Sequence, residues 1–193
     1  MRTYPLSMAV LSLAALIFGT PGPAAADQVS AKIVAGMKSP DKMNRDLAQL
    51  IGEWEGKGKI RPARSFPRAK VKCTMNAVWL EGGRVIKQSM RCKSLLMRVN
   101  RTSYIAYDKA TGRYVGRDFG NLGPDNVAIS GTGTGNRFDM STTYYKSGSD
   151  KPKHNRLVIR TGDGGTMSTV LTKVSSRPYE IMNVVYRRLG GTI

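Results

Sequence analysis

Hydrophobic and polar residues alternate with a period of two on both sides of Gly82-Gly83, within the stretch Lys72–Lys93. Two adjacent glycines accept the positive φ values of a tight hairpin turn, so the chain is predicted to fold back there. Counted outward from that turn, Cys73 lies directly opposite Cys92. The pattern predicts a disulfide-linked β-hairpin. A two-residue turn would place the cysteines at a hydrogen-bonded pair of the ladder. A four-residue turn over 81–84 would place them at a non-hydrogen-bonded pair, and the sequence is compatible with either turn.

One face of this hairpin is mostly apolar. Besides the cysteines it carries Met75, Ala77, Trp79, Ile86, Gln88 and Met90. Because side chains alternate between the two faces of a strand, these residues share one side of the sheet. Such a face must point into a core or a cavity, and Gln88 is its only polar group.

A helical pattern precedes the strands. Ser39 is suited to cap a helix and Pro40 to occupy its first position. The apolar residues of this segment form a single stripe: Met43, Leu47, Leu50 and Ile51. Gly52 ends the pattern. A helix this short needs a surface to pack on, and the mouth or flank of a sheet is predicted to supply it.

After Gly52 the period is two as far as the end of the chain, with about ten strands separated by short turns. Gly56 and Gly58 share the inner face of the first strand, where they predict a bend or a close backbone approach. Leu95–Val99 reads as a separate strand and Ser147–Asn155 as a polar loop. The predicted fold is all-β, an antiparallel up-and-down barrel with one short N-terminal helix. A two-sheet sandwich stays open as the alternative.

The N-terminus predicts export. An apolar run, Leu6–Phe18, follows a basic start, and Ala24–Ala26 precedes Asp27 as a small-residue cleavage site. The run is shorter than the about 20 residues of a membrane-spanning helix. We expect a signal peptide over residues 1–26, a flexible arm over 27–37 and the barrel domain over 38–193. A periplasmic or secreted location would allow the disulfide to form.

Charge adds a second functional hypothesis. The chain has 31 Lys and Arg against 13 Asp and Glu, a formal net charge of +18. Such a charge attracts anionic lipids and polymers. The basic residues are scattered rather than gathered in one run, which does not favour a nucleic-acid site.

Three short motifs resemble a known family. Leu47–Trp54 contains the Gly-x-Trp signature of the calycin superfamily, which includes lipocalins. Together with Tyr104–Val115 and Tyr186-Arg187-Arg188, it is similar to an exported bacterial family of lipocalin-like barrels of unknown function. In lipocalins the motif Trp closes one barrel end beneath a late Arg. The resemblance implies this structural role for Trp54, with Arg188 as the favoured partner and Arg187 as the alternative.

Catalytic chemistry has little support in the sequence. The single histidine, His154, lies in the charged loop predicted above, and pairing of both cysteines leaves no thiol nucleophile. No residues have the spacing of a transition-metal site. Nitrobindin-like barrels bind haem through a histidine near the end of the chain, and the final strands here contain none. We expect no enzymatic activity, no cofactor and no metal.

The interior is therefore the favoured site. We expect a cavity that binds an apolar or amphiphilic small molecule, with or without an anionic head group. Its wall would include Met75, Trp79, Ile86, Gln88 and Met90. A filled core is the structural alternative. The functional alternative is a basic protein that contacts anionic polymers or lipids of the cell envelope and binds no small molecule.

Overall fold

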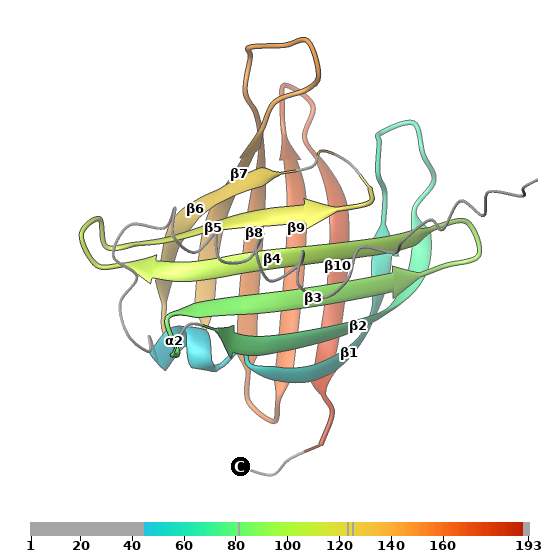
Figure 1. Ribbon diagram of the computed structural model, residues 1–193. Coiled ribbons are helices and arrows are strands. Elements are labelled where there is room, and N and C mark those ends of the chain that lie inside the picture. The colour runs from blue at the N-terminus through green and yellow to red at the C-terminus, as the bar shows by residue number, and fades with distance from the viewer. Residues whose placement is uncertain (1–44, 81, 123, 125, 191–193) are drawn as a thin grey trace, which may run out of the picture.

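The chain folds into a closed barrel of ten antiparallel strands (Figure 1). The computed structural model describes residues 45–80, 82–122, 124 and 126–190. The strands are β1 (Gly52–Ile60), β2 (Ala69–Leu80), β3 (Val85–Lys93), β4 (Arg98–Asp108), β5 (Arg113–Gly120), β6 (Val127–Thr134), β7 (Arg137–Tyr144), β8 (Lys153–Gly162), β9 (Thr166–Val174) and β10 (Tyr179–Arg188). Each strand pairs with the next one in sequence, and β10 pairs with β1. This confirms the up-and-down barrel and excludes the sandwich.

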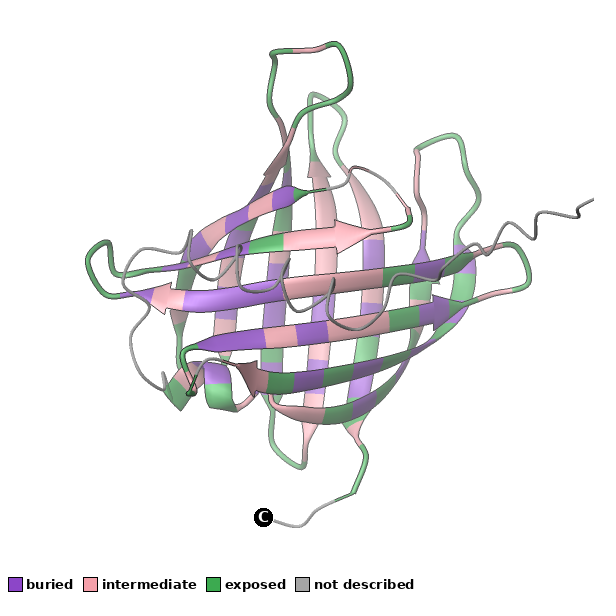
Figure 2. Ribbon diagram, viewed as in Figure 1, coloured by how far each residue is buried: buried purple, intermediate pink, exposed green. Residues whose placement is uncertain are grey.

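Buried and exposed residues alternate along the strands (Figure 2). The alternation is strict in β2 from Ala69 to Val78. The inward side chains form the main core. On the outer face of β3 and β4, Val85, Tyr104 and Ala106 form a second, smaller cluster. The period-two pattern of the sequence thus corresponds to the inside and outside of one barrel.

The disulfide-linked hairpin has the predicted register. β2 and β3 place Cys73 opposite Cys92, and the two residues form a disulfide. The strands end at Leu80 and resume at Val85, so four residues connect them. The Cα atoms of the cysteines are 4.0 Å apart. This distance is near the about 4.5 Å of a non-hydrogen-bonded pair, as the four-residue turn requires.

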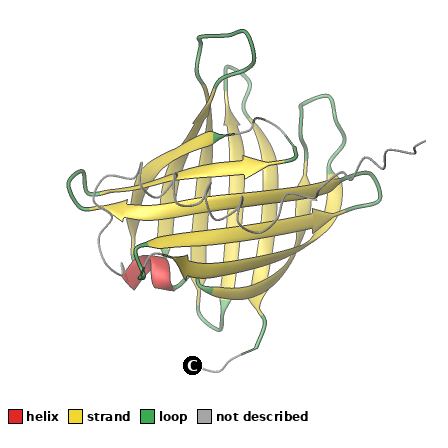
Figure 3. Ribbon diagram, viewed as in Figure 1, coloured by secondary structure: helices red, strands yellow, loops and turns green. Residues whose placement is uncertain are grey.

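A short helix, α2 (Arg45–Ala48), lies across one end of the barrel (Figure 3). Leu47 and Leu50 are buried there in the core. The predicted helix start at Ser39 and Pro40, the signal peptide 1–26 and the arm 27–37 all lie outside the described residues. Within the described part of the chain, no helix is both long and apolar enough to cross a membrane.

Gln49, which follows α2, connects the helix to the strands beneath it. Its side-chain Nε2 donates to the Gly135 carbonyl at 3.0 Å, and its Oε1 accepts from the Thr161 hydroxyl at 2.6 Å. These bonds reach the β6–β7 turn and the end of β8. The helix segment is therefore held against the far side of the barrel as well as against β1, into which it leads.

Arg188, at the end of β10, connects the last strand to the same segment. Its guanidinium carbon lies 4.5 Å from the ring centroid of Trp54. Nη1 donates to the Ile51 carbonyl at 2.7 Å and Nη2 to the Gln49 carbonyl at 2.9 Å. The Trp54 indole N–H donates to the Leu50 carbonyl at 3.0 Å. The stack on Trp54 is thus made by Arg188, and neighbouring Arg187 is exposed.

The two glycines of β1 allow close approach. A Cβ atom at Gly56 would lie 2.6 Å from a ring carbon of Tyr186. At Gly58 it would lie 2.0 Å from the Asn183 carbonyl oxygen. Larger residues would collide with β10 at both positions. The glycines therefore allow β1 and β10 to pair while the Tyr186 ring occupies the interior.

The prediction of a separate strand over Leu95–Val99 is wrong. β4 begins at Arg98, and Ser94–Met97 forms a loop between β3 and β4. The Ser94 hydroxyl accepts hydrogen bonds from two backbone N–H groups of this loop, at 3.1 and 3.0 Å. A serine side chain that binds nearby backbone groups competes with the strand ladder. The loop leaves Leu95 and Leu96 exposed.

The predicted polar loop also ends too late. β8 starts at Lys153, which pairs with Tyr144 of β7, so His154 and Asn155 are strand residues. His154 is exposed, and its Nδ1 lies 3.1 Å from the Thr143 hydroxyl. Asn155 is buried. The sequence predicted a loop here because the residues before His154 are mostly polar and charged.

Removing the disulfide is expected to lower the stability of the fold. The double variant Cys73→Ala/Cys92→Ala lacks the covalent loop, and the chain-entropy estimate gives about 3 kcal/mol less free energy of unfolding. Urea denaturation of the variant, the oxidised parent and the reduced parent measures the difference. Equal midpoints for all three would contradict this expectation.

Replacing each of two adjacent arginines in turn should show that Arg188, at the closed end, stabilises the fold and that Arg187, on the surface, does not. Arg188→Ala removes two hydrogen bonds from a charged donor and the stack on Trp54, so we expect a loss of about 3 kcal/mol. Arg187→Ala is the matched control and should change stability by less than about 0.5 kcal/mol. Similar denaturation midpoints for both variants would show that Arg188 does not stabilise the closed end.

Candidate ligand-binding cavity

The end of the barrel opposite α2 contains a cavity of about 230 Å³. Its wall includes Tyr186 and Met167, which are buried, and Pro62, Leu122 and Tyr179, which are half-exposed and lie in or beside loops. The cavity therefore reaches from the packed centre of the barrel to the loops at its open end. We call this end the mouth.

The wall is mainly apolar. Its apolar side chains are Ile60, Met75, Met90, Val99, Leu122, Val127, Ile129, Leu157, Ile159, Met167, Leu171, Ile181 and Met182. The volume exceeds the about 150 Å³ of an engineered cavity that binds benzene. It is below the about 300–1,000 Å³ of sites for drug-sized ligands. The space suits a small molecule or the end of a longer chain that extends through the mouth.

The residues predicted from the hairpin divide into two groups. Met75, Gln88 and Met90 line the cavity. Trp79 and Ile86 do not: Ile86 is fully buried in the core, and Trp79 packs against that core. Both are nearer the β2–β3 turn, which lies at the closed end, where large side chains fill the barrel. The hairpin face is thus shared between a filled half and a hollow half.

Two buried polar atoms of the wall have no hydrogen-bond partner among the described residues. They are Nε2 of Gln88 on β3 and Oδ1 of Asn155 on β8. Each residue is 7% exposed. The other amide atom of Asn155, Nδ2, donates to the Thr142 hydroxyl at 3.2 Å. An unpaired buried polar atom lowers the stability of the fold by about 1–3 kcal/mol. The wall therefore presents one donor and one acceptor that are each free to form a hydrogen bond with a ligand.

A charged group lies in the same wall. Arg101 Nη2 is 2.6 Å from Asp118 Oδ2, and Arg101 Nε donates to that oxygen at 2.8 Å. The Ser103 hydroxyl donates to Asp118 Oδ1 at 3.0 Å. Burial raises the pKa of the Asp118 carboxyl, and the Arg101 charge and both side-chain hydrogen bonds oppose that rise. Arg101 also donates to the Leu122 carbonyl at 2.7 Å. The group therefore holds the loop after β5 at the mouth.

Lys173 supplies a positive charge without an acidic partner among the described residues. Its Nζ donates to the Tyr144 hydroxyl at 2.6 Å and lies 4.7 Å from that ring's centroid. In the sheet, Lys173 pairs with Asn155 on one side and Tyr179 on the other. A cation thus stands beside the unpaired amide oxygen, near the mouth.

Tyr186 lies at the inner end of the cavity. Its hydroxyl donates to the Met90 sulfur at 3.3 Å. Burial raises the pKa of the Tyr186 hydroxyl well above its usual range, so the phenol remains protonated and neutral. This end of the cavity is therefore formed by an aromatic ring and a thioether.

Several wall residues were missed from the sequence. Asn155 has the same inward parity as Leu157 and Ile159, so extending the alternation of β8 backward by one step would have found it. Arg101 and Asp118 gave no such signal, because a charged residue in a strand is ordinarily expected to face solvent. The β4–β5 ladder, which pairs Ser103 with Asp118 and Arg101 with Gly120, brings the two side chains together.

No cluster of metal-ligand side chains occurs among the described residues. The cavity wall also contains no histidine, and Asp118 is paired with Arg101. The cavity wall offers an apolar surface, two amide atoms without hydrogen-bond partners among the described residues, and a lysine. These features can hold and orient a molecule.

The fold and the cavity define a ten-stranded barrel protein with an internal cavity that reaches the loops at one end. A family described as a protein of unknown function (DUF1579) matches residues 39–188, and the chain belongs to this family. No curated protein matches the chain. A relationship to lipocalins stays a prediction.

Replacing Gln88 with methionine should not destabilise the free protein. The substitution Gln88→Met keeps the length of the side chain and removes a donor that has no partner, so the free energy of unfolding should be unchanged or rise by about 1 kcal/mol. Thermal and urea denaturation measure this. Asn155→Ala is the comparison, because it also removes the bond to Thr142. A clear loss of stability in Gln88→Met would mean that Gln88 is already paired.

Proposed function

We propose that this protein binds a small amphiphilic molecule inside its barrel. The observation that carries this proposal is an apolar cavity whose wall contains two buried amide atoms without partners. A filled core would leave no such volume, and unmet buried amides lower stability unless a ligand satisfies them.

The apolar part of the ligand lies against the hairpin residues Met75 and Met90 and against the facing strands. Methionine side chains adapt to irregular apolar shapes, so this wall accepts a chain or a ring. Trp79 and Ile86 support the wall from the core. The volume of the cavity suits an enclosed group that is larger than benzene and smaller than most drugs.

The polar part of the ligand points toward the mouth. There it meets the Lys173 ammonium group and the Asn155 amide oxygen, which are neighbours in the sheet. Deeper in the cavity, nearer the closed end than Met90, Gln88 offers a donor on the opposite wall. A carboxylate or another small anionic group matches the Lys173 cation, and a hydroxyl group of the ligand would donate to the Asn155 oxygen, while the rest of the molecule is apolar.

We further propose that the protein retains its ligand without reacting with it, and that it works outside the cytoplasm. The ionisable groups of the wall support retention, because Asp118 is held by Arg101 and Lys173 by Tyr144. The Cys73–Cys92 disulfide supports an oxidising compartment such as the periplasm, and the predicted signal peptide agrees.

Blocking the cavity tests the proposal. Thr169 faces the cavity from β9, and Thr172 lies on the outer face of the same strand. We expect decanoate to bind the parent with micromolar affinity in calorimetric titrations. Thr169→Phe should weaken binding at least about tenfold by filling the space, and Thr172→Phe should leave it unchanged.

The head-group interaction is tested separately. Lys173→Met should weaken decanoate and leave the uncharged analogue decanol unaffected, because only the carboxylate loses a charge partner. Absence of binding for both molecules, or equal effects of the two phenylalanine variants, would refute an internal site. Native-source protein analysed by mass spectrometry would reveal the resident molecule.

A further inference from the structure

We propose that the mouth of the barrel docks on an anionic lipid bilayer through one basic face and one exposed leucine loop. The basic face is the outer surface of β1, β2, β3 and the start of β4. Its cations are Lys57, Lys59, Lys70, Lys72, Arg91, Lys93 and Arg98, all exposed. This inference concerns the outside of the barrel and does not rest on the internal ligand.

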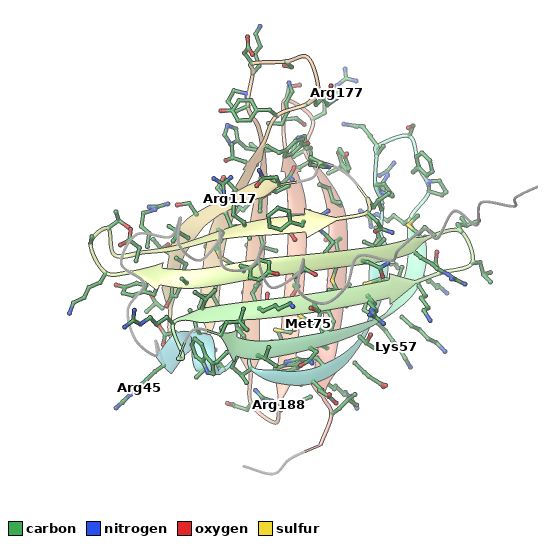
Figure 4. The ribbon with its side chains drawn as sticks, in the orientation of Figure 1. Arg45, Lys57, Met75, Arg117, Arg177 and Arg188 are labelled. Atoms are coloured by element: carbon green, nitrogen blue, oxygen red, sulfur yellow. A yellow bond between two sulfur atoms is a disulfide. The ribbon has the colours of Figure 1, made fainter. Side chains whose placement is uncertain are left out.

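The strand register gathers these cations into rows. Lys57 pairs with Lys72, Lys72 with Lys93, and Lys93 with Arg98, so four adjacent strands each present a cation in one line. Neighbouring strands are about 4.8 Å apart. Lys59 and Lys70 form a shorter row nearer the mouth. Figure 4 labels Lys57 on the outside of this part of the barrel, in contrast to Met75.

Acidic residues do not neutralise the face. None of its seven cations forms an ion pair with any acid that the structure describes. Glu55, on the same side of β1, pairs across the sheet with Arg187. Like charges directly opposite each other destabilise a sheet, so an anionic partner would relieve a cost that the free protein bears.

The leucine loop adjoins these rows. Lys93 and Arg98 flank the loop Ser94–Met97, at whose tip Leu95 is fully exposed (105%) and Leu96 is 74% exposed. The Ser94 hydrogen bonds to the loop backbone hold this tip in shape. Exposed leucines between cations suit the boundary of head groups and acyl chains, where apolar side chains enter and basic ones meet phosphate.

A second loop at the mouth also places an exposed apolar residue between two cations. The β1–β2 loop contains Phe66, which is 53% exposed, between Arg64 and Arg68. Arg61 Nε donates to the Phe66 carbonyl at 2.9 Å, and Arg64 Nη1 donates to the Arg177 carbonyl of the β9–β10 loop at 3.3 Å. These bonds hold the β1–β2 loop, which lies at the same end of the barrel as the β3–β4 loop that carries the leucines (Figure 1).

The exposed leucines favour a lipid bilayer over other polyanions as the partner of this surface. A nucleic acid or a polysaccharide would use the cations alone and leave Leu95 and Leu96 in water. A bilayer with anionic lipids satisfies both kinds of residue at once. With its mouth at the membrane, the cavity would open toward the lipid.

Vesicle binding tests the charges. The purified full chain should co-sediment with vesicles of equal parts phosphatidylglycerol and phosphatidylcholine, but not with phosphatidylcholine alone, and added salt should weaken the binding. The triple variant Lys57→Gln/Lys72→Gln/Lys93→Gln should lose about a hundredfold in affinity, at about fivefold per cation.

The matched control for charge removes three exposed cations near the closed end. Lys109→Gln/Arg113→Gln/Arg160→Gln has the same net charge as the first triple variant and should bind within a few-fold of the parent. Equal losses for the two triple variants would show that net charge, and not the basic face, governs binding. That result would overturn the proposal.

The leucines are tested by a double variant and by fluorescence. Leu95→Ser/Leu96→Ser should weaken vesicle binding at least about tenfold. Its control, Val78→Ser/Leu189→Ser, alters exposed apolar residues near the closed end and should bind as the parent does. All variants share residues 1–44, so differences among them report on the barrel.

Insertion has its own signal. The emission of Leu96→Trp should shift to the blue on phosphatidylglycerol vesicles and be quenched by brominated lipid, whereas Leu189→Trp should show neither change. If vesicles bind while the emission of Leu96→Trp stays unshifted, the leucines do not enter the bilayer. Undiminished binding of the leucine double variant, with heparin bound equally well, would assign the face to polyanions in general.

Discussion

The contact between Arg188 and Trp54 joins the last strand to the first and to the helix that lies over them. The two residues face each other in the β1–β10 ladder, and Arg188 also binds two backbone carbonyls between α2 and β1. Closing the barrel at this seam removes two strand edges that would otherwise be open to other chains. It also covers one end of the interior, so the apolar residues there are kept from water.

The interior of the barrel differs between the closed end and the mouth. Near α2, large side chains such as Trp54, Tyr114 and Phe138 fill the barrel and are almost fully buried. The hollow part has Gln88 and Asn155 in its wall, and their side-chain atoms without hydrogen-bond partners lower the stability of the free protein. The disulfide between β2 and β3 offsets part of such costs and fixes the register that places Gln88 on the inner face. A rigid, filled half thus supports a hollow half.

The charges follow the same division. Inside, Arg101 and Asp118 neutralise each other, while Lys173 donates to the Tyr144 hydroxyl and has no acidic partner among the described residues. Outside, the cations of β1–β3 lie in unpaired rows that end beside Leu95 and Leu96. The proposed membrane surface and the proposed internal amphiphile would be partners of related chemistry, because both combine an anionic group with an apolar one.

The sequence by itself determined what depends on local alternation and turn chemistry. The two glycines at the turn and the period of two were enough to predict the Cys73–Cys92 pair, and the short turns between strands favoured an up-and-down barrel over a sandwich, because each strand contacts its sequence neighbours. It did not determine the division of the interior: Trp79 and Met75 lie on the same hairpin face, yet only Met75 reaches the cavity. Nor did it reveal that Asn155 and Asp118 face inward, because polar residues in a strand are ordinarily expected outside. The ladders between neighbouring strands place these two residues inside. The division of the interior was decided by the closure of the tertiary structure, which alone fixes how much volume the side chains fill and which distant strands face each other.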